Sequence, residues 1–201
     1  LQATLVRADL PLSLLCGAEV ALSRLPGLGE DEIRRVCLGH SSYALVESPY
    51  SPVGSVIEQS LFELQVRGFR PVLAHPERCP EFRRDIPRLK RLVENGVTCS
   101  VSAGSIVGQF GPTVRRFAGR LLELELVHNV SSDGHDAVSR RPQLSGAFRD
   151  RKAPLSDPGV RRWLTSTVPA AILRDEPLPP PPPMSSPSRW WRPTARSRTA
   201  T

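Results

Sequence analysis

The strongest constraint on the fold is an alternation, along most of the chain, between short apolar runs and amphipathic helical patterns. Short runs rich in valine, leucine and alanine are typical of strands buried on both faces. They lie at residues 12–15 running into 18–22, and at 43–46, 71–74, 97–101 and 126–130. The alternation predicts an α/β fold built on a parallel sheet of about five visible strands.

Helical patterns separate these runs. Residues 53–66, 85–94 and 113–124 each place apolar side chains on one helical face. Gly68 and Gly96 follow two of them as stop signals, and Pro112 precedes the third. Strand–helix–strand units of this kind form right-handed crossovers between parallel strands. Farther along, residues 160–167 predict a last short helix and residues 170–173 a packed turn.

The chain divides by composition into two parts. Residues 1–175 carry the α/β pattern and predict one domain. Residues 176–201 hold five consecutive prolines at 179–183, followed by serine, tryptophan and arginine. This composition predicts a disordered tail with polyproline II character. A proline-binding domain could recognise the tail, although a solvated extension is the simpler interpretation.

The charge and the cysteines exclude several functions. The net charge is +7, but four arginines of the tail face one acid there, and the charges of the body are mixed. We therefore expect no nucleic-acid partner. No apolar run approaches the roughly 20 residues of a membrane span, which predicts a cytoplasmic protein. The four cysteines form no close pairs and are expected to be reduced thiols.

Acidic and histidine residues follow the predicted strands at their carboxyl ends. Glu19, Glu47 and His75 each come at or just after an apolar run, and Asp133 and His135 follow the run at 126–130. The carboxyl ends of parallel strands share one face, where α/β proteins place their sites. Carboxylates gathered there without a cation would be costly, and carboxylates with imidazoles suit manganese, iron or zinc. The pattern predicts a divalent-metal site.

Each of these residues also has an ordinary structural interpretation. Glu47 could pair with an arginine at a strand end, and His75 taken alone is more often a hydrogen-bonded structural histidine. Asp133 and His135 are more specific, because alternation in an extended segment can turn both toward one ion. His40 lies in a loop and His128 at a strand start, so both are interpreted as non-ligands.

A cysteine-based tyrosine phosphatase needs the spacing Cys-x5-Arg, in which a loop and an arginine surround the thiolate. None of the four cysteines is followed by arginine at that spacing. The residues found there are Leu22, Tyr43, Asp85 and Ser105. The sequence excludes this mechanism.

Several motifs together carry a resemblance to a known family. They are LAHPER at 73–78, SDGH at 132–135, the strand and turn at 43–49, and GQFG at 108–111. Over roughly residues 12–142 the chain resembles the bacterial capsular-polysaccharide tyrosine phosphatases of the polymerase-and-histidinol-phosphatase superfamily. The resemblance implies a distorted (β/α)7 barrel. The family's opening His-x-His and a further histidine would precede Leu1, so we expect an N-terminally truncated, partial barrel with an incomplete ligand set.

The resemblance also implies a site and an activity. The implied ligands of a manganese-type cluster are Glu19, Glu47, His75, Asp133 and His135. Arg78 and Arg140 would hold the phosphate, with Arg141 as a rival to Arg140. The implied reaction is hydrolysis of protein phosphotyrosine by metal-activated water, with a bacterial tyrosine kinase of exopolysaccharide synthesis as the substrate. The alternatives are another phosphoesterase of the superfamily, such as a histidinol phosphatase, or an inactive remnant acting as a binding scaffold.

Overall fold

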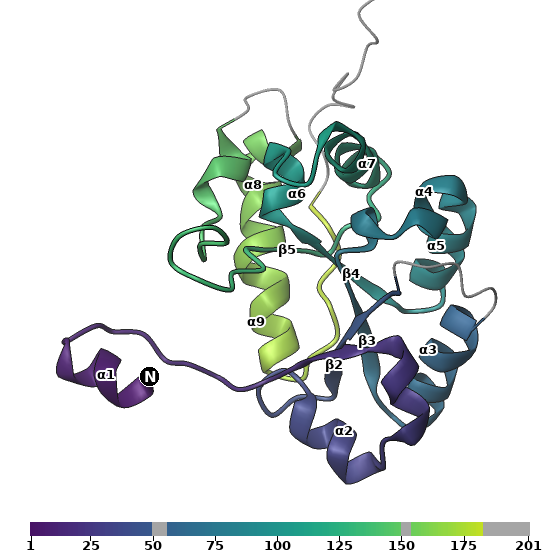
Figure 1. Cartoon of the computed structure of the whole chain (residues 1–201), viewed down its shortest axis with the longest axis horizontal. Coiled ribbons are helices and arrows are strands. Elements are labelled where there is room, and N and C mark those ends of the chain that lie inside the picture. The colour runs from purple at the N-terminus through teal and green to yellow at the C-terminus, as the bar shows by residue number, and fades with distance from the viewer. Residues whose placement is uncertain (50–55, 150–153, 183–201) are drawn as a thin grey trace, which may run out of the picture.

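The centre of the molecule is a parallel sheet whose five strands follow one another in sequence order. The computed structural model describes residues 1–49, 56–149 and 154–182. The strands in this part of the chain are β1 (Glu19–Ala21), β2 (Tyr43–Glu47), β3 (Arg70–Ala74), β4 (Thr98–Ser102) and β5 (Asn129–Ser131) (Figure 1). The predicted α/β fold with a five-stranded parallel sheet is confirmed.

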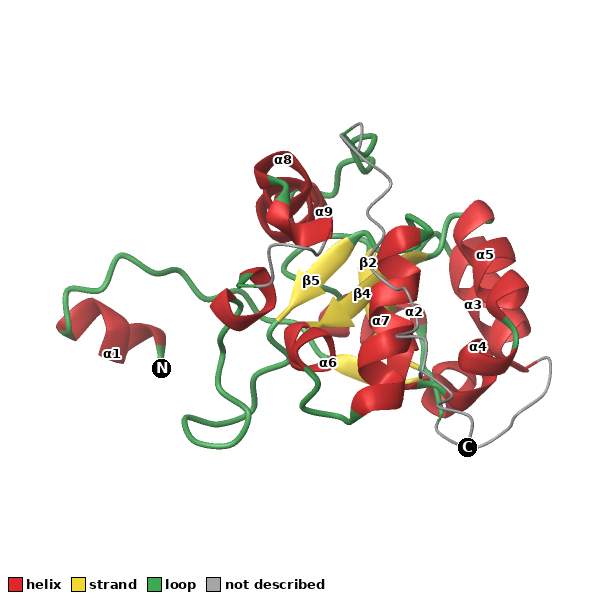
Figure 2. Ribbon diagram, turned by 90° about the horizontal axis from the view of Figure 1, so that it is seen from above, coloured by secondary structure: helices red, strands yellow, loops and turns green. Residues whose placement is uncertain are grey.

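Helices connect the strands and cover the sheet. They are α1 (Gln2–Arg7), α2 (Glu30–Val36), α3 (Val56–Val66), α4 (Pro80–Arg84), α5 (Ile86–Glu94), α6 (Ala103–Val107), α7 (Pro112–Glu123), α8 (Pro158–Arg162) and α9 (Val168–Leu173). Right-handed crossovers between strands in sequence order place the connecting helices on one side. Figure 2 shows α3, α4, α5 and α7 on that side and α8 and α9 on the other. Short 3-10 turns lie at Leu22–Gly27, Pro76–Arg78, Ser145–Phe148 and Pro154–Ser156.

The two faces of the sheet differ in chemistry because successive strand residues point to opposite faces. One face is apolar and buried; it carries Ala44, Val46, Leu73, Cys99, Val101 and Val130. The buried side chains of α3, Ile57, Leu61 and Leu64, belong to the same core. The other face carries Leu45, Val72, Ser100, Asn129 and Ser131, which line a cavity of about 320 Å³ beneath α9. The polar side chains of the sheet therefore lie on the cavity face, among apolar neighbours that include Leu45 and Val72, and the face toward α3 is apolar.

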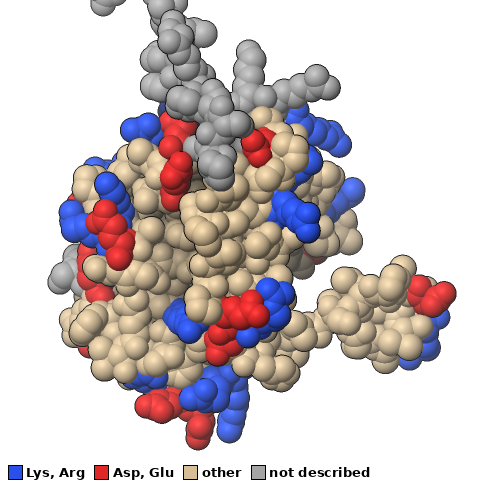
Figure 3. Space-filling view, turned by 180° about the vertical axis from the view of Figure 1, so that it is seen from behind, with Lys and Arg blue, Asp and Glu red and all other residues tan. Residues whose placement is uncertain are grey.

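The predicted strand at residues 12–15 is wrong. These residues form no strand, and Leu12 and Leu15 are each 55% exposed. A strand needs a hydrogen-bonded neighbour, and among the described residues β1 pairs with β2 alone. The segment instead leads away from the body to α1, which stands apart in Figures 1 and 3.

The helix expected at 160–167 and the turn expected at 170–173 form one continuous helical stretch. Between α8 and α9 the backbone widens into a π-helical turn, Trp163–Thr167. Pro169 follows in the first turn of α9. Proline lacks an amide hydrogen, and its ring collides with the carbonyl four residues earlier in a regular helix. The wider turn accommodates Pro169 without ending the helix, so the residues expected to form a packed turn belong to α9.

The chain beyond α9 returns to the body. The Tyr43 hydroxyl donates to the carbonyl of Glu176 at 2.7 Å, and the Trp163 indole donates to the carbonyl of Pro179 at 3.1 Å. Leu178 packs against the core. Residues 176–182 are thus attached to the domain. Residues 183–201 lie outside the described residues, and the disorder expected for them stays a prediction. Residues 53–55, the start of a predicted helix, also lie outside the described residues.

Two surface properties complete the description. On the face shown in Figure 3, acidic and basic side chains are interspersed, as the mixed composition of the body predicted. Within the described ranges, no helix is both long and apolar enough to cross a bilayer.

Candidate metal centre at the carboxyl ends of the strands

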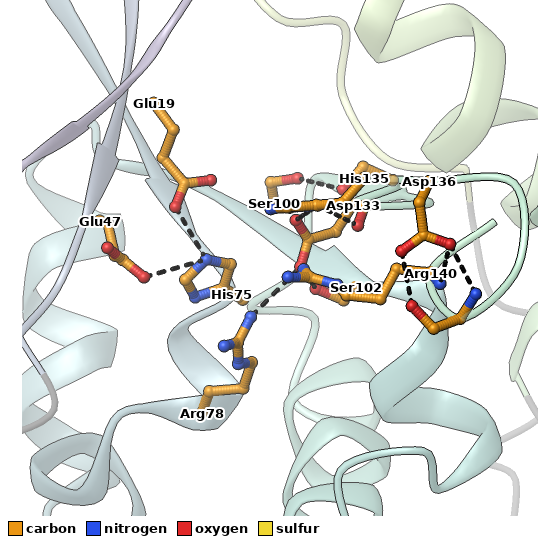
Figure 4. A network of polar contacts seen from close by, with 12 residues as sticks. Glu19, Glu47, His75, Arg78, Ser100, Ser102, Asp133, His135, Asp136 and Arg140 are labelled. Carbon is orange, nitrogen blue, oxygen red and sulfur yellow. Dashed lines mark hydrogen bonds and ion pairs between the residues drawn. The ribbon is translucent and has the colours of Figure 1, made fainter. Parts of the chain in front are cut away.

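Three side chains from three neighbouring strands meet at one end of the sheet. Glu19 opens β1, Glu47 closes β2, and His75 directly follows β3. The Nε2 atom of His75 lies 3.1 Å from Oε1 of Glu19 and 3.6 Å from Oε1 of Glu47 (Figure 4). One ligand atom from each of the three residues lies within 4.8 Å of the other two. Of the five ligands that the sequence predicted, the structure brings these three together, and their role as metal ligands stays a prediction.

This donor set fits a divalent cation. It offers two carboxylate oxygens and one imidazole nitrogen, which manganese, iron and zinc accept together. His75 is 6% exposed, whereas the two glutamates are about one-third exposed, so the group opens to solvent on one side. The hydrogen bond from His75 lowers the pKa of Glu19 below its ordinary value. Nε2 of His75 lies where a shared cation would bind, and it would bind a metal through its lone pair.

The backbone at His75 explains how one motif delivers two functional side chains. His75 adopts a left-handed conformation with φ of +32°, which ends β3 and starts the 3-10 turn Pro76–Arg78. Such a conformation costs on the order of 1 kcal/mol for a non-glycine residue and needs support from its surroundings. The His75 amide donates to the carbonyl of Ser100 at 2.7 Å, and the Arg78 amide donates to the carbonyl of His75 at 2.9 Å. The turn therefore fixes His75 and Arg78 relative to β4.

Asp133 lies next to this group but has different partners. Its Oδ2 atom accepts from Nη1 of Arg78 at 3.2 Å, from Nη2 of Arg140, and from the hydroxyl of Ser102 at 3.3 Å. The Asp133 side chain is 10% exposed, and its φ is +50°. Asp133, Glu19 and His75 line the same cavity. The structure therefore brings both predicted arginines together, on a carboxylate beside the three metal-type donors (Figure 4).

His135 and Arg141, two further predicted site residues, are more exposed. The ring of His135 is 57% exposed, and its Nδ1 atom lies 3.0 Å from the carbonyl oxygen of Asp133. His135 lies outside the three-residue group, and its role as a ligand stays a prediction. Arg141 is exposed and lines a second cavity, whereas Arg140 reaches Asp133. Of the two rivals, Arg140 is the one in the arginine pair.

Asp136 holds the loop that presents Arg140. Its Oδ1 atom accepts from the amides of Val138, Ser139 and Arg140, at 2.7, 2.6 and 3.2 Å. The hydroxyl of Ser139 donates to its other oxygen at 2.5 Å. These bonds lower the pKa of Asp136 well below its ordinary range. Sequence reasoning gave Asp136 no role, although it directly follows the SDGH motif.

Sequence reasoning also missed Glu77, which lies between the two functional residues of LAHPER. Glu77 is fully buried, and its Oε1 atom accepts from the amide of Ser102 at 3.1 Å and from the hydroxyl of Ser105 at 2.6 Å. Burial raises the pKa of Glu77. The side chain ties the turn after β3 to the end of β4. The feature of the sequence that could have pointed to Glu77 is its place inside the LAHPER motif, between His75 and Arg78.

The remaining histidines have no part in the group. His40 is exposed in a turn before β2. His128 directly precedes β5, at the opposite end of the strands, as its place in the sequence predicted. Its Nδ1 atom accepts from the Cys99 amide at 3.2 Å, and its ring lies 6.2 Å from that of Trp163. Burial lowers the pKa of His128 to about 4.

Comparison with known proteins places the chain among bacterial capsule proteins. Residues 1–173 match the family described as capsular polysaccharide synthesis, CpsB/CapC. The chain is 37% identical over 139 residues to tyrosine-protein phosphatase YwqE of Bacillus subtilis, covering 68% of the chain and 54% of YwqE. It is 30% identical over 145 residues to putative tyrosine-protein phosphatase CapC of Staphylococcus aureus, covering 71% of the chain and 56% of CapC. The chain thus spans about half the length of these curated relatives.

A solved structure shares the fold. It comes from the crystal structures of YwqE from Bacillus subtilis and CpsB from Streptococcus pneumoniae, described as metal-dependent tyrosine phosphatases. The superposition has a TM-score of 0.73 at 30% identity, and it covers 92% of this chain and 74% of the other. The parallel α/β arrangement of this chain is therefore that of a structure with metal-dependent phosphatase chemistry.

Proposed function

The chain belongs to the CpsB/CapC capsular polysaccharide synthesis family, and from this premise we propose that it is a metal-dependent protein-tyrosine phosphatase. The observation that carries the proposal is the meeting, at one end of the sheet, of two kinds of group. Glu19, Glu47 and His75 form a cation-type donor set, and two arginines converge beside it on Asp133. Metal donors next to paired guanidinium groups are the requirements of phosphoryl transfer to water.

Each residue has a proposed role. Glu19, Glu47 and His75 would hold the cation, with Asp133 and His135 as further ligands. The chemistry that a bound divalent cation supplies is an activated water and neutralisation of phosphate charge. Manganese is the proposed metal, because the donors are rich in carboxylate.

Arg78 and Arg140 are the proposed phosphate-binding groups. The acceptor they share in the structure is a carboxylate oxygen of Asp133. A phosphoryl oxygen is an equivalent charged acceptor, and guanidinium groups bind it through paired, charge-assisted hydrogen bonds. The tyrosine leaving group has a pKa near 10, so the demand for a general acid is modest. The two arginines would hold the phosphate and stabilise charge that develops on its oxygens.

The finer features of the proposal follow from the family. The sequential order of the five parallel strands supports the proposal of a partial, distorted (β/α)7 barrel. The capsule-related family supports a phosphorylated bacterial tyrosine kinase as the substrate. The proposed location is the cytoplasm, where ATP-dependent phosphorylation takes place.

Hydrolysis of a phosphotyrosine peptide by the full chain tests the proposal. We expect phosphate release that requires manganese and stops on addition of a chelator. His75→Ala and Glu47→Ala should each lower the rate at least about a hundredfold, because each removes a ligand of the proposed metal. His40→Ala and Glu94→Ala are matched controls at exposed positions and should retain the rate. Activity that survives in both ligand variants, or no activity in the metal-loaded wild-type chain, would contradict the proposal.

A further inference from the structure

The turn that joins α6 to α7 places an aromatic side chain beside the site. It has the sequence GQFG, and Gly108 and Gly111 both adopt positive φ, at +91° and +90°. Residues that carry a side chain rarely adopt such positive φ values, so glycine at both positions allows the tight turn. The turn is also attached to the loop that presents Arg140, because Nε2 of Gln109 donates to the carbonyl of Ser139 at 3.0 Å. Phe110 is therefore held in one position.

The ring of Phe110 contacts both arginines of the site. The guanidinium carbon of Arg78 lies 4.6 Å from the ring centroid, and that of Arg140 lies 5.9 Å from it. Both distances are in the range of cation–π attraction. The same two guanidinium groups share Oδ2 of Asp133. One aromatic ring thus supports the two groups that the proposed function assigns to the phosphate.

Phe110 also forms a wall of a cavity of about 440 Å³ that opens next to this pair. Asp133 and Arg140 are among the residues that line the cavity. Its apolar lining comes from α6, from Phe110 and from the 132–147 loop, and includes Ala103, Val107, Phe110, Val138 and Ala147. Gln109, Arg141 and Gln143 add polar groups. The cavity thus combines apolar side chains with many polar groups and adjoins paired cations, an arrangement that suits a flat ring carrying an anion.

We propose that this cavity binds the aryl group of a phosphate monoester, with Phe110 as its wall and as the support of Arg78 and Arg140. The inference rests on the proposed function and adds to it the position of the leaving group. The ring would contact Phe110 and Val107 while its phosphate reaches the arginines. Selectivity for aryl over alkyl phosphates would then arise from burial of the ring in this cavity.

Binding of two non-hydrolysable phosphonates to the full chain tests the inference without requiring turnover. Phenylphosphonate and methylphosphonate share the anionic group and differ in the ring. Titration calorimetry in a manganese-containing buffer should give wild type a preference of about tenfold or more for phenylphosphonate. Val107→Trp fills the cavity and should bring the ratio of the two dissociation constants close to one. Val66→Trp, at a 70% exposed position on α3, is the matched control and should keep the wild-type ratio.

A second pair of variants tests Phe110 as the support of the arginines. Phe110→Leu removes the π-face and should weaken binding of methylphosphonate, which has no ring, by about fivefold. Phe110→Tyr keeps the aromatic face and should restore the affinity. Thermal unfolding of each variant shows whether the fold is retained.

The possible results distinguish a failure of the inference from a failure of the proposed function. Equal binding of the two phosphonates by wild type, or an unchanged ratio in Val107→Trp, overturns the aryl site and leaves the proposed function standing. Equal methylphosphonate affinity in wild type and Phe110→Leu overturns the supporting role of Phe110. Failure of wild type to bind either phosphonate overturns the anion site itself, and with it both the proposed function and the inference.

Discussion

Nε2 of His75 lies 3.1 Å from Oε1 of Glu19, although 56 residues separate them in the chain and a whole strand lies between them in the sheet. The contact forms because the parallel strands lie side by side, with Glu19 at the start of β1, and because the left-handed backbone of His75 turns the chain where β3 ends. Glu47, from the intervening strand, completes the group. The predictions below follow from this arrangement and from its surroundings.

Asp133→Asn should strengthen the binding of an anion when no metal is bound. Asp133 occupies the guanidinium groups of Arg78 and Arg140, and its negative charge opposes a bound phosphate. Removal of one like charge at a short, partly screened distance is worth about 1 kcal/mol, so phenylphosphonate should bind about fivefold more tightly to the variant in the presence of a chelator. Calorimetric titration measures this, with Asp31→Asn as the exposed control. Weaker binding by the variant would show that Asp133 does not compete with the anion.

Cys79 should be dispensable, although it directly follows Arg78. The thiol is buried, at 2% exposure for the residue, and burial raises its pKa, so it is a poor nucleophile. Cys79→Ser should hydrolyse a phosphotyrosine peptide within about twofold of wild type. Iodoacetamide should alkylate the exposed Cys16 without loss of rate. A folded but inactive Cys79→Ser chain would point to thiol chemistry.

Stability should fall in acid through His128. Its pKa in the folded chain is about 4, against an ordinary value of 6.5, because burial disfavours the charged ring. A base with a depressed pKa stabilises the fold above its unfolded pKa and loses that contribution as the pH falls from 6.5 toward 4. The loss is on the order of 2 to 3 kcal/mol.

Urea unfolding at several pH values measures this loss. His128→Asn retains an acceptor for the Cys99 amide and does not titrate, so its stability should fall less over this range. His40→Asn replaces an exposed histidine and should behave as wild type. Equal acid sensitivity in the two variants would assign the effect to other groups.

The segment after α9 should contribute to stability. Trp163 is 9% exposed and donates to the Pro179 carbonyl, and Leu178 packs on the core. Truncation after Glu176 should cost about 1 to 2 kcal/mol and shift the Trp163 emission to longer wavelength. The reference is the full chain with Trp190→Phe and Trp191→Phe, which likewise keeps Trp163 as its sole tryptophan. Matching emission and unfolding curves would mean that the segment does not pack on Trp163 in solution.

Much of the fold could be predicted because the buried strands are apolar and the helices between them carry clear stop signals. The runs that became β2, β3 and β4 were found with their boundaries nearly correct. The run at residues 12–15 has the same composition, but it has no neighbouring strand in the described chain, and composition does not report pairing. The short helix predicted at residues 160–167 continues to residue 173 because a π-helical turn accommodates Pro169.

The site was predictable where it depends on strand ends and obscure where it depends on loops. Glu47 and His75 could be placed together because each lies at the carboxyl end of a strand. Glu19 was expected to follow a strand, but the run before it forms none, and Glu19 instead opens β1. The positions of Arg140 and Phe110 depend on how two loops fold against each other, through Asp136 and Gln109, and no periodicity encodes that contact. The buried Glu77 needed the structure, because its partners lie at the end of β4 and in α6.

The most direct test of the account is manganese binding by the full chain, followed by the electron paramagnetic resonance signal of the free ion. Wild type should bind manganese, and Glu19→Gln, Glu47→Gln and His75→Ala should each weaken binding at least about tenfold, because each removes one donor of a shared cation. His40→Ala should bind as wild type does. Manganese affinity that is the same in His75→Ala as in wild type would contradict the central claim that these three side chains hold one ion.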